Sequence, residues 1–310
     1  MIDLMRPTVA GPASSLAEEW AAMEHRSGVL PLLERFFAAR KAFAEVAAGR
    51  VRGALGLFTP APEPGWEAAA VAGEPAGGGL LVRGDVRLPG PTARGSIVLV
   101  RLPDATHRLA WVDHDAPGVE RRRSRTARSG GPPGDGPCWL HIEEAAIGTD
   151  LVSRPVTLAP DGELARLLAD YAGVWATAAA SCARDGVRAL RRAARMAAMQ
   201  TSQLVALRIT EVEIEADLAC RAAQEPSGRP AALAALAAAA AAARILVAVA
   251  ATTGELRDAF GLEVEGPFGS AAPGASGASG SACGLTAFLG GPLLLESELA
   301  RALGIAEARG

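Results

Sequence analysis

Apolar residues change their spacing twice along the chain. They recur at helical intervals from Ser14 to Gly53, and they form short runs between Gly and Pro from Leu55 to Ile147. Helical intervals return from Asp161 onward. Apolar residues on one face of a helix repeat about every 3.6 positions, whereas short runs bounded by turn residues are typical of strands. The order helix, strand, helix therefore predicts an α+β fold that is mainly α.

The helical regions divide into several predicted elements. The N-terminal region predicts two helices that are broken near Gly28 and Pro31. In the C-terminal region a helix begins at Asp161–Glu163, and further helices follow at about Val187–Ala223, Pro230–Thr253 and Leu293–Leu303. Long amphipathic helices of this kind pack as an up-and-down bundle, so we expect a C-terminal four-helix bundle over residues 159–310.

Four apolar runs stand out in the middle region: Gly79–Val82, Ser96–Val100, Leu109–Val112 and Trp139–Ile142. Strands at such intervals suggest a small antiparallel barrel or sandwich. We therefore predict a central β-barrel domain over residues 55–158, preceded by a short N-terminal helical region over residues 1–54.

Composition excludes several classes of function. The net charge of −3 gives no reason to expect a nucleic acid or an anionic membrane as partner. The longest apolar run, Ala231–Ala251, is interrupted by Arg244 and is rich in alanine, which predicts a packed helix and no membrane span. The four cysteines and four histidines are too widely spaced for a metal site. With no signal sequence evident at the N-terminus, we expect a cytoplasmic protein.

Four local motifs then occur in an informative order. They are Gly49–Glu67 (GRVRGALGLFTPAPEPGWE), Leu81–Val86 (LVRGDV), Trp139–Ile147 (WLHIEEAAI) and Asp258–Pro267 (DAFGLEVEGP). In order and spacing they resemble the acyl-CoA dehydrogenase family, in which an N-terminal helical domain, a β domain and a four-helix bundle follow one another. In that family FAD lies between the β domain and the bundle and reaches into a neighbouring subunit.

The resemblance implies FAD as the cofactor and an acyl thioester as the substrate. A carboxylate of the enzyme removes the α-proton and the flavin takes the β-hydride. Carried onto this sequence, the predicted cofactor-binding residues are Thr59, Gly65, Arg191 (or Arg192), Gln200 (or Gln203), Gly254 and Gly261.

Several positions depart from the family pattern. Trp66 occupies the place of a serine, and Leu88, Pro89 and Gly90 replace the residues that cover the flavin ring. No carboxylate occurs from Gly266 to Leu295, where the family commonly places its base. The weak candidates that remain are Asp185, Glu263 and Glu265, with Glu265 the foremost.

These departures predict a catalytically depleted subunit of a heteromeric, FAD-dependent complex that desaturates an acyl thioester. The partner would be a longer chain of the same family or a second copy. Tyr171, Val174 and Trp175, with Ala231–Ala251, are expected to form its apolar contact face. The alternatives are an autonomous flavoenzyme with a remodelled pocket and a flavin-free scaffold. The Arg-rich segment Arg121–Arg128 is either solvated or a grip for an acidic group.

Overall fold

The computed structural model describes residues 16–57, 71–88, 93–123, 138–159, 162–199, 202–224, 231–264 and 268. The chain begins with α1 (Leu16–Glu24), the π-helical turn η1 (His25–Val29) and α2 (Leu30–Phe36), followed by the short turns η2 (Arg40–Phe43) and α3 (Ala44–Ala47). The predicted break near Gly28 and Pro31 was wrong, because helical backbone continues through both. Pro31 is the second residue of α2, which directly follows the π-helical turn η1.

Eight strands form one sheet: β1 (Gly53–Gly56), β2 (Val71–Ala76), β3 (Gly79–Leu88), β4 (Gly95–Arg101), β5 (His107–Asp113), β6 (Val119–Arg123), β7 (Cys138–Gly148) and β8 (Val152–Val156). Their order is β6-β7-β3-β2-β4-β5-β8, and β1 pairs with β4 next to β2. All four predicted runs lie within strands. The alternation of side chains in β4 directs Ile97 and Leu99 to one apolar core and Val98 and Val100 to another.

The prediction of a closed barrel was wrong. Among the described strands, β6 and β8 are the two ends of the sheet and do not pair with each other. Helix α2 lies against the β8 edge instead, where the Arg154 guanidinium stacks 5.2 Å from the ring centroid of Phe36. Arg154 also binds Glu163 together with Arg35. A helix that covers a strand edge removes the need to pair it with another strand.

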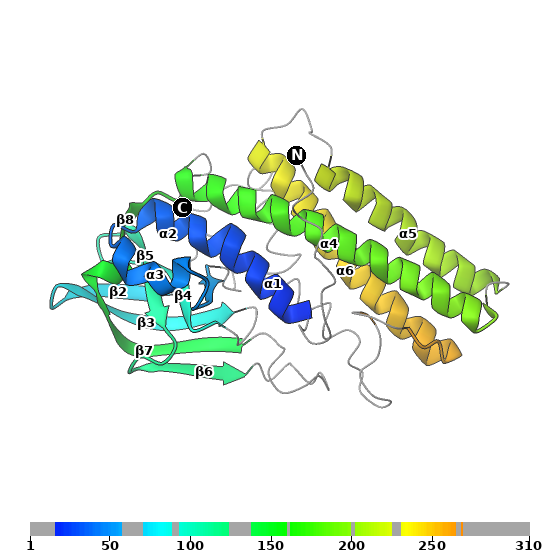
Figure 1. Ribbon diagram of the computed structural model, residues 1–310, viewed down its shortest axis with the longest axis horizontal. Coiled ribbons are helices and arrows are strands. Elements are labelled where there is room, and N and C mark those ends of the chain that lie inside the picture. The colour runs from blue at the N-terminus through cyan, green and yellow to red at the C-terminus, as the bar shows by residue number, and fades with distance from the viewer. Residues whose placement is uncertain are drawn as a thin grey trace.

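Three long helices follow the sheet: α4 (Glu163–Met196), α5 (Gln203–Gln224) and α6 (Ala231–Phe260). Figure 1 shows α4 running from the sheet to the far end of the bundle, with α1 and α2 beside its first half. The predicted helix start near Val187 was wrong, since α4 continues through Gly186 and the chain turns only after Met196. The predicted helix Leu293–Leu303 lies outside the described residues.

Helix α6 is mostly apolar, with its charged residues limited to Arg244 and the last two turns. Its residues Leu233–Phe260 are long and apolar enough to cross a membrane by length and composition, and 56% of the most apolar window is buried inside the protein. The alanines Ala238, Ala239, Ala242 and Ala243 are buried in the core that α6 shares with α4 and α5. The core helix of a globular domain passes the same test. Helix α6 packs against α4 as such a core helix does.

The predicted apolar contact face was wrong for Tyr171 and Trp175, whereas Val174 is half-buried. Tyr171 and Trp175 are fully buried within the chain, at 0% exposure, and the alanines of α6 face the same core. Periodicity identifies an apolar face correctly but does not indicate whether the neighbouring helix belongs to the same chain.

Candidate functional site

Helices α1 and α2 pack antiparallel to the first half of α4, and three contacts fix their register. Near one end the rings of Trp20 and Trp175 meet edge to face with centroids 5.8 Å apart. In the middle Gly28 lies against Tyr171, since a Cβ built on Gly28 would be 3.5 Å from that ring. At the other end Arg35 binds Glu163.

Glu24 falls between the levels of Tyr171 and Trp175 in this register. One turn of helix separates it from Gly28, so both face α4. The Glu24 side chain is buried, and its Oε1 accepts a hydrogen bond of 3.3 Å from the backbone N–H of Leu55 on β1. Burial raises the pKa of this carboxyl well above its ordinary value, and the bond from Leu55 offsets only part of that rise. Burial therefore favours the protonated form of this carboxyl.

Two further polar atoms at this place have no hydrogen-bond partner among the described residues. They are the hydroxyl of Tyr171 and the indole Nε1 of Trp175, both on side chains with 0% exposure. Buried donors are almost always satisfied in folded proteins, by protein groups, water or a ligand. Glu24, Tyr171 and Trp175 are here called the buried polar cluster, because each places a buried polar group where α1 and η1 meet α4.

His25 holds this region to the sheet. Its Nδ1 accepts a 3.1 Å hydrogen bond from the backbone N–H of Gly53, and its Nε2 lies 3.1 Å from the carbonyl oxygen of Val46. Those partners require the tautomer with the proton on Nε2. Burial lowers the pKa of His25, so the ring stays neutral at pH 7. The imidazole therefore fixes η1 against β1 and thereby positions Glu24.

Two of the residues predicted to bind the cofactor make contacts within the chain, one an ion pair and the other a hydrogen bond at a helix end. Arg191 of α4 forms an ion pair with Glu213 of α5. Gly261 ends α6 with a positive φ of 65°, and its N–H donates to the carbonyl of Arg257 over 2.8 Å. Thr59, Gly65 and Gln200 lie outside the described residues. The FAD-binding role of these residues stays a prediction.

The candidate bases that the structure describes do not belong to the buried polar cluster. Asp185 is exposed on α4 and pairs with Arg188 at 3.1 Å. Glu263 is exposed just after α6, and Glu265 lies outside the described residues. Among the described residues, Glu24 is the one carboxylic acid that is buried.

Two other polar groupings are structural. In the described part of the Arg-rich segment, Arg122 pairs with Glu120 at 2.8 Å on β6, whereas Arg125 and Arg128 lie outside it. Ser96 Oγ lies 2.7 Å from Nε2 of His114, whose Nδ1 is 2.9 Å from the carbonyl of Ala93. Burial lowers the pKa of His114 to about 4. Both side chains are sealed from solvent, so this pair joins β4 to the end of β5 and offers no accessible nucleophile. No group of three or more potential metal ligands occurs in the described ranges.

Comparisons with known proteins bear on the fold. A scan of family models and a search of curated proteins found no match to the sequence. Among solved structures, a glutaryl-CoA dehydrogenase from Mycobacterium smegmatis superposes with a TM-score of 0.70 at 15% identity, over 94% of this chain and 77% of the other. The chain has the acyl-CoA dehydrogenase fold. The enzyme FkbI of methoxymalonyl extender-unit biosynthesis shares this fold (TM-score 0.66, 19% identity, 94% and 81% covered).

A third structure with the acyl-CoA dehydrogenase fold is a complex of two chains. It is the ChsE4–ChsE5 complex from Mycobacterium tuberculosis, at a TM-score of 0.61 and 17% identity over 94% of this chain and 80% of the matched one. At these identities the likeness concerns the fold. The predicted acyl-CoA dehydrogenase-like architecture is confirmed, with an open sheet in place of the barrel.

Reasoning from the sequence missed the buried polar cluster. One signal was present: Glu24 stands one turn after Trp20 and one turn before Gly28, on the apolar face of the helix. A carboxylic acid at a core position costs free energy unless it is neutral or paired. The helical spacing alone therefore marks Glu24 as a candidate for function.

Proposed function

We propose that this chain is the catalytically depleted subunit of a heteromeric, FAD-dependent complex that introduces a double bond into an acyl thioester. A partner of the same fold supplies the base and completes the cofactor site. FAD would supply the hydride acceptor when bound in that complex. The acyl-CoA dehydrogenase fold over 94% of the chain is the observation that carries the proposal.

Two features of this chain support depletion. The described candidate residues for cofactor and base, Arg191, Gly261 and Asp185, are occupied with ion pairs or helix capping. The buried polar cluster adds a carboxylic acid and two donors where α1 and α4 face each other. Burial favours the protonated form of Glu24, which donates a hydrogen bond, so Glu24 suits binding of a polar ligand group better than removal of a proton.

The test compares the chain alone with the chain co-expressed with a longer member of the same fold. We expect little flavin absorbance from the chain alone, and stoichiometric FAD and dehydrogenation activity from the purified complex. Stoichiometric FAD on the chain alone would favour the autonomous flavoenzyme. A colourless chain that binds no such relative would favour the scaffold.

The substitution Glu265→Gln tests whether this chain lacks a catalytic base or uses Glu265 as one. Loss of a general base lowers the rate by roughly 10²- to 10⁴-fold. If Glu265 is not the base, the variant complex should keep its activity within a few-fold. A loss of the larger size, with the complex still assembled, would contradict the proposal that this chain lacks a base.

A further inference from the structure

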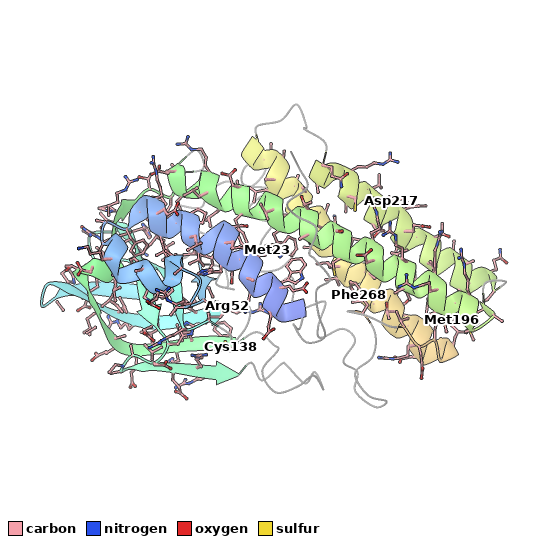
Figure 2. The ribbon with its side chains drawn as sticks, in the orientation of Figure 1. Met23, Arg52, Cys138, Met196, Asp217 and Phe268 are labelled. Carbon is pink, nitrogen blue, oxygen red and sulfur yellow. The ribbon has the colours of Figure 1, made fainter. Side chains whose placement is uncertain are left out.

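The outer face of β7 carries an indole that lies outside both apolar cores. Figure 2 shows Cys138 at the start of β7, and Cys138, Leu140 and Ile142 all point into one apolar core. Successive side chains of a strand alternate between the two faces of a sheet, so Trp139 and His141 point to the opposite face. Trp139 is half-buried there, and neither core of the described residues includes it. Figure 1 shows this part of the sheet on the side away from α1 and α2.

Two arginines flank this indole across the neighbouring strands. In the register of the sheet, Trp139 lies directly opposite Arg87 of β3 and directly opposite Arg122 of β6. Side chains in such opposite positions share a face, and their Cβ atoms are about 5 Å apart. The three side chains are here called the Arg–Trp–Arg row, because they form one band across β3, β7 and β6.

The two arginines differ in their charge partners. Arg122 forms an ion pair with Glu120 at 2.8 Å. Arg87 is half-buried, and none of the described carboxylates pairs with it, so burial lowers the pKa of its guanidinium with nothing to offset the effect. A partly desolvated cation without a counter-ion is unfavourable, and a bound anion would supply the missing charge. Arg87 is therefore the end of the row at which an anion would bind.

We propose that the Arg–Trp–Arg row binds a nucleoside phosphate, with the base stacked on Trp139 and the phosphate bound by Arg87. A guanidinium can bind two phosphate oxygens at once, and an indole stacks on any base because every base has a π-face. The ribose separates the base from the phosphate, which suits an indole and a guanidinium that stand on neighbouring strands.

The next row of the same face limits the size of the ligand. It consists of Asp85, His141 and Glu120, one on each of the same three strands. The side chains of Asp85 and Glu120 are 59% and 63% exposed, and Nδ1 of His141 lies 2.7 Å from Oδ1 of Asp85. Two exposed carboxylates beside the row repel the further phosphates that a nucleic-acid strand would bring. The face therefore suits a single nucleotide and disfavours a polyanion.

The first experiment is isothermal titration calorimetry of the full chain with AMP, adenosine and inorganic phosphate. We expect AMP to bind at one site per chain, and adenosine and phosphate each to bind at least about ten-fold more weakly, since each lacks one of the two contacts. Absence of AMP binding would overturn the proposal. Adenosine or phosphate binding as tightly as AMP would overturn it too, because one contact alone would then account for the affinity.

The second experiment repeats the AMP titration on variants whose fold is checked by circular dichroism. Arg87→Gln should weaken AMP binding roughly 10- to 100-fold and leave adenosine binding unchanged, because it removes the phosphate contact alone. Trp139→Leu should weaken AMP binding roughly 5- to 100-fold, whereas Trp139→Phe, which keeps a ring, should retain most of it.

Arg83→Gln is the matched control. Arg83 also lies on β3, but it pairs with Glu74 and stands outside the Arg–Trp–Arg row, so its loss should leave the affinity for AMP unchanged. If AMP bound equally well to wild type, Arg87→Gln and Trp139→Leu, its site would lie elsewhere and the proposal would be refuted. The titrations need neither FAD nor dehydrogenation activity, so their outcome is independent of the proposed function.

Discussion

Glu24 is the residue whose chemistry the fold alters most. It lies on a helix between two aromatic residues of α4, with Leu55 N–H as its one described hydrogen-bond donor. Removal from water disfavours the charged form, so the proton stays on the folded protein over a pH range in which it leaves the unfolded chain. Keeping a carboxylic acid there costs stability at neutral pH, which is typical of sites retained for binding.

This predicts a pH dependence with a definite sign. Above the ordinary pKa of glutamate the unfolded chain releases the proton while the folded chain retains it, so the contribution of Glu24 to stability falls as pH rises toward its folded pKa. Each pH unit in that window corresponds to about 1.4 kcal/mol. Glu24→Gln keeps an acceptor for Leu55 and removes the proton. Urea denaturation should show the variant gaining stability over wild type as pH rises above the ordinary pKa of glutamate toward the raised pKa of Glu24 in the folded chain. Glu215→Gln, an exposed control, should show no such gain, and a parallel pH dependence of wild type and Glu24→Gln would contradict the neutral carboxyl.

At the scale of the element, α4 contains two glycines with different surroundings. A Cβ on Gly186 would come within 2.5 Å of the ring of Phe268 and 2.9 Å of Val249 Cγ1, whereas a Cβ on Gly173 would meet Ala235 Cβ at an ordinary 3.6 Å. Alanine favours a helix by roughly 1 kcal/mol over glycine. Gly173→Ala should therefore stabilise the protein by about that amount, while Gly186→Ala should destabilise it by roughly 1–3 kcal/mol through overpacking. Urea midpoints of the two variants, measured side by side, check both signs. Equal shifts would show that α6 does not approach α4 this closely.

The same helix shows what the sequence could and could not predict. The strands were found because Gly and Pro bound short apolar runs, and α6 was found from its continuous apolar pattern. The continuity of α4 was missed because Gly186 resembles a helix end, while its actual role is to let Phe268 and α6 approach. The closed barrel was mispredicted because an edge strand pattern does not reveal that a helix covers the edge. Arg191 and Gly261 were chosen because they match a sequence motif. The motif does not reveal that Arg191 pairs with Glu213 of α5 or that Gly261 caps the end of α6.

At the scale of the whole molecule, one apolar core joins all three regions. Phe36 and Phe43 of the N-terminal segment, Trp111 of the sheet, and Trp175 and Leu246 of the bundle belong to it. The apolar core therefore continues across the predicted boundary near residue 158. The sheet face that carries Ile97, Leu99 and Leu109 lies in this core together with the N-terminal helices and the bundle.

We accordingly expect one cooperative unfolding transition. Tryptophan fluorescence, which reports on all five tryptophans, and far-ultraviolet circular dichroism should give coincident curves in urea. A fragment ending at residue 158 should not fold, because its apolar face would lose its cover. Two separated transitions, or a folded fragment with dispersed amide resonances, would show that the regions are independent.

The packing of α6 against α4 has a consequence for how the chain is made. Synthesis proceeds from the N-terminus, and domains acquire structure in that order. The segment Leu233–Phe260, which a translocation machinery could mistake for a bilayer anchor, leaves the ribosome only after α4 and α5 have been completed. A docking surface of alanines from α4, among them Ala179 and Ala183, is then already outside the exit tunnel. The order of the helices thus shortens the time during which the most lipid-like part of the nascent polypeptide is without a protein neighbour.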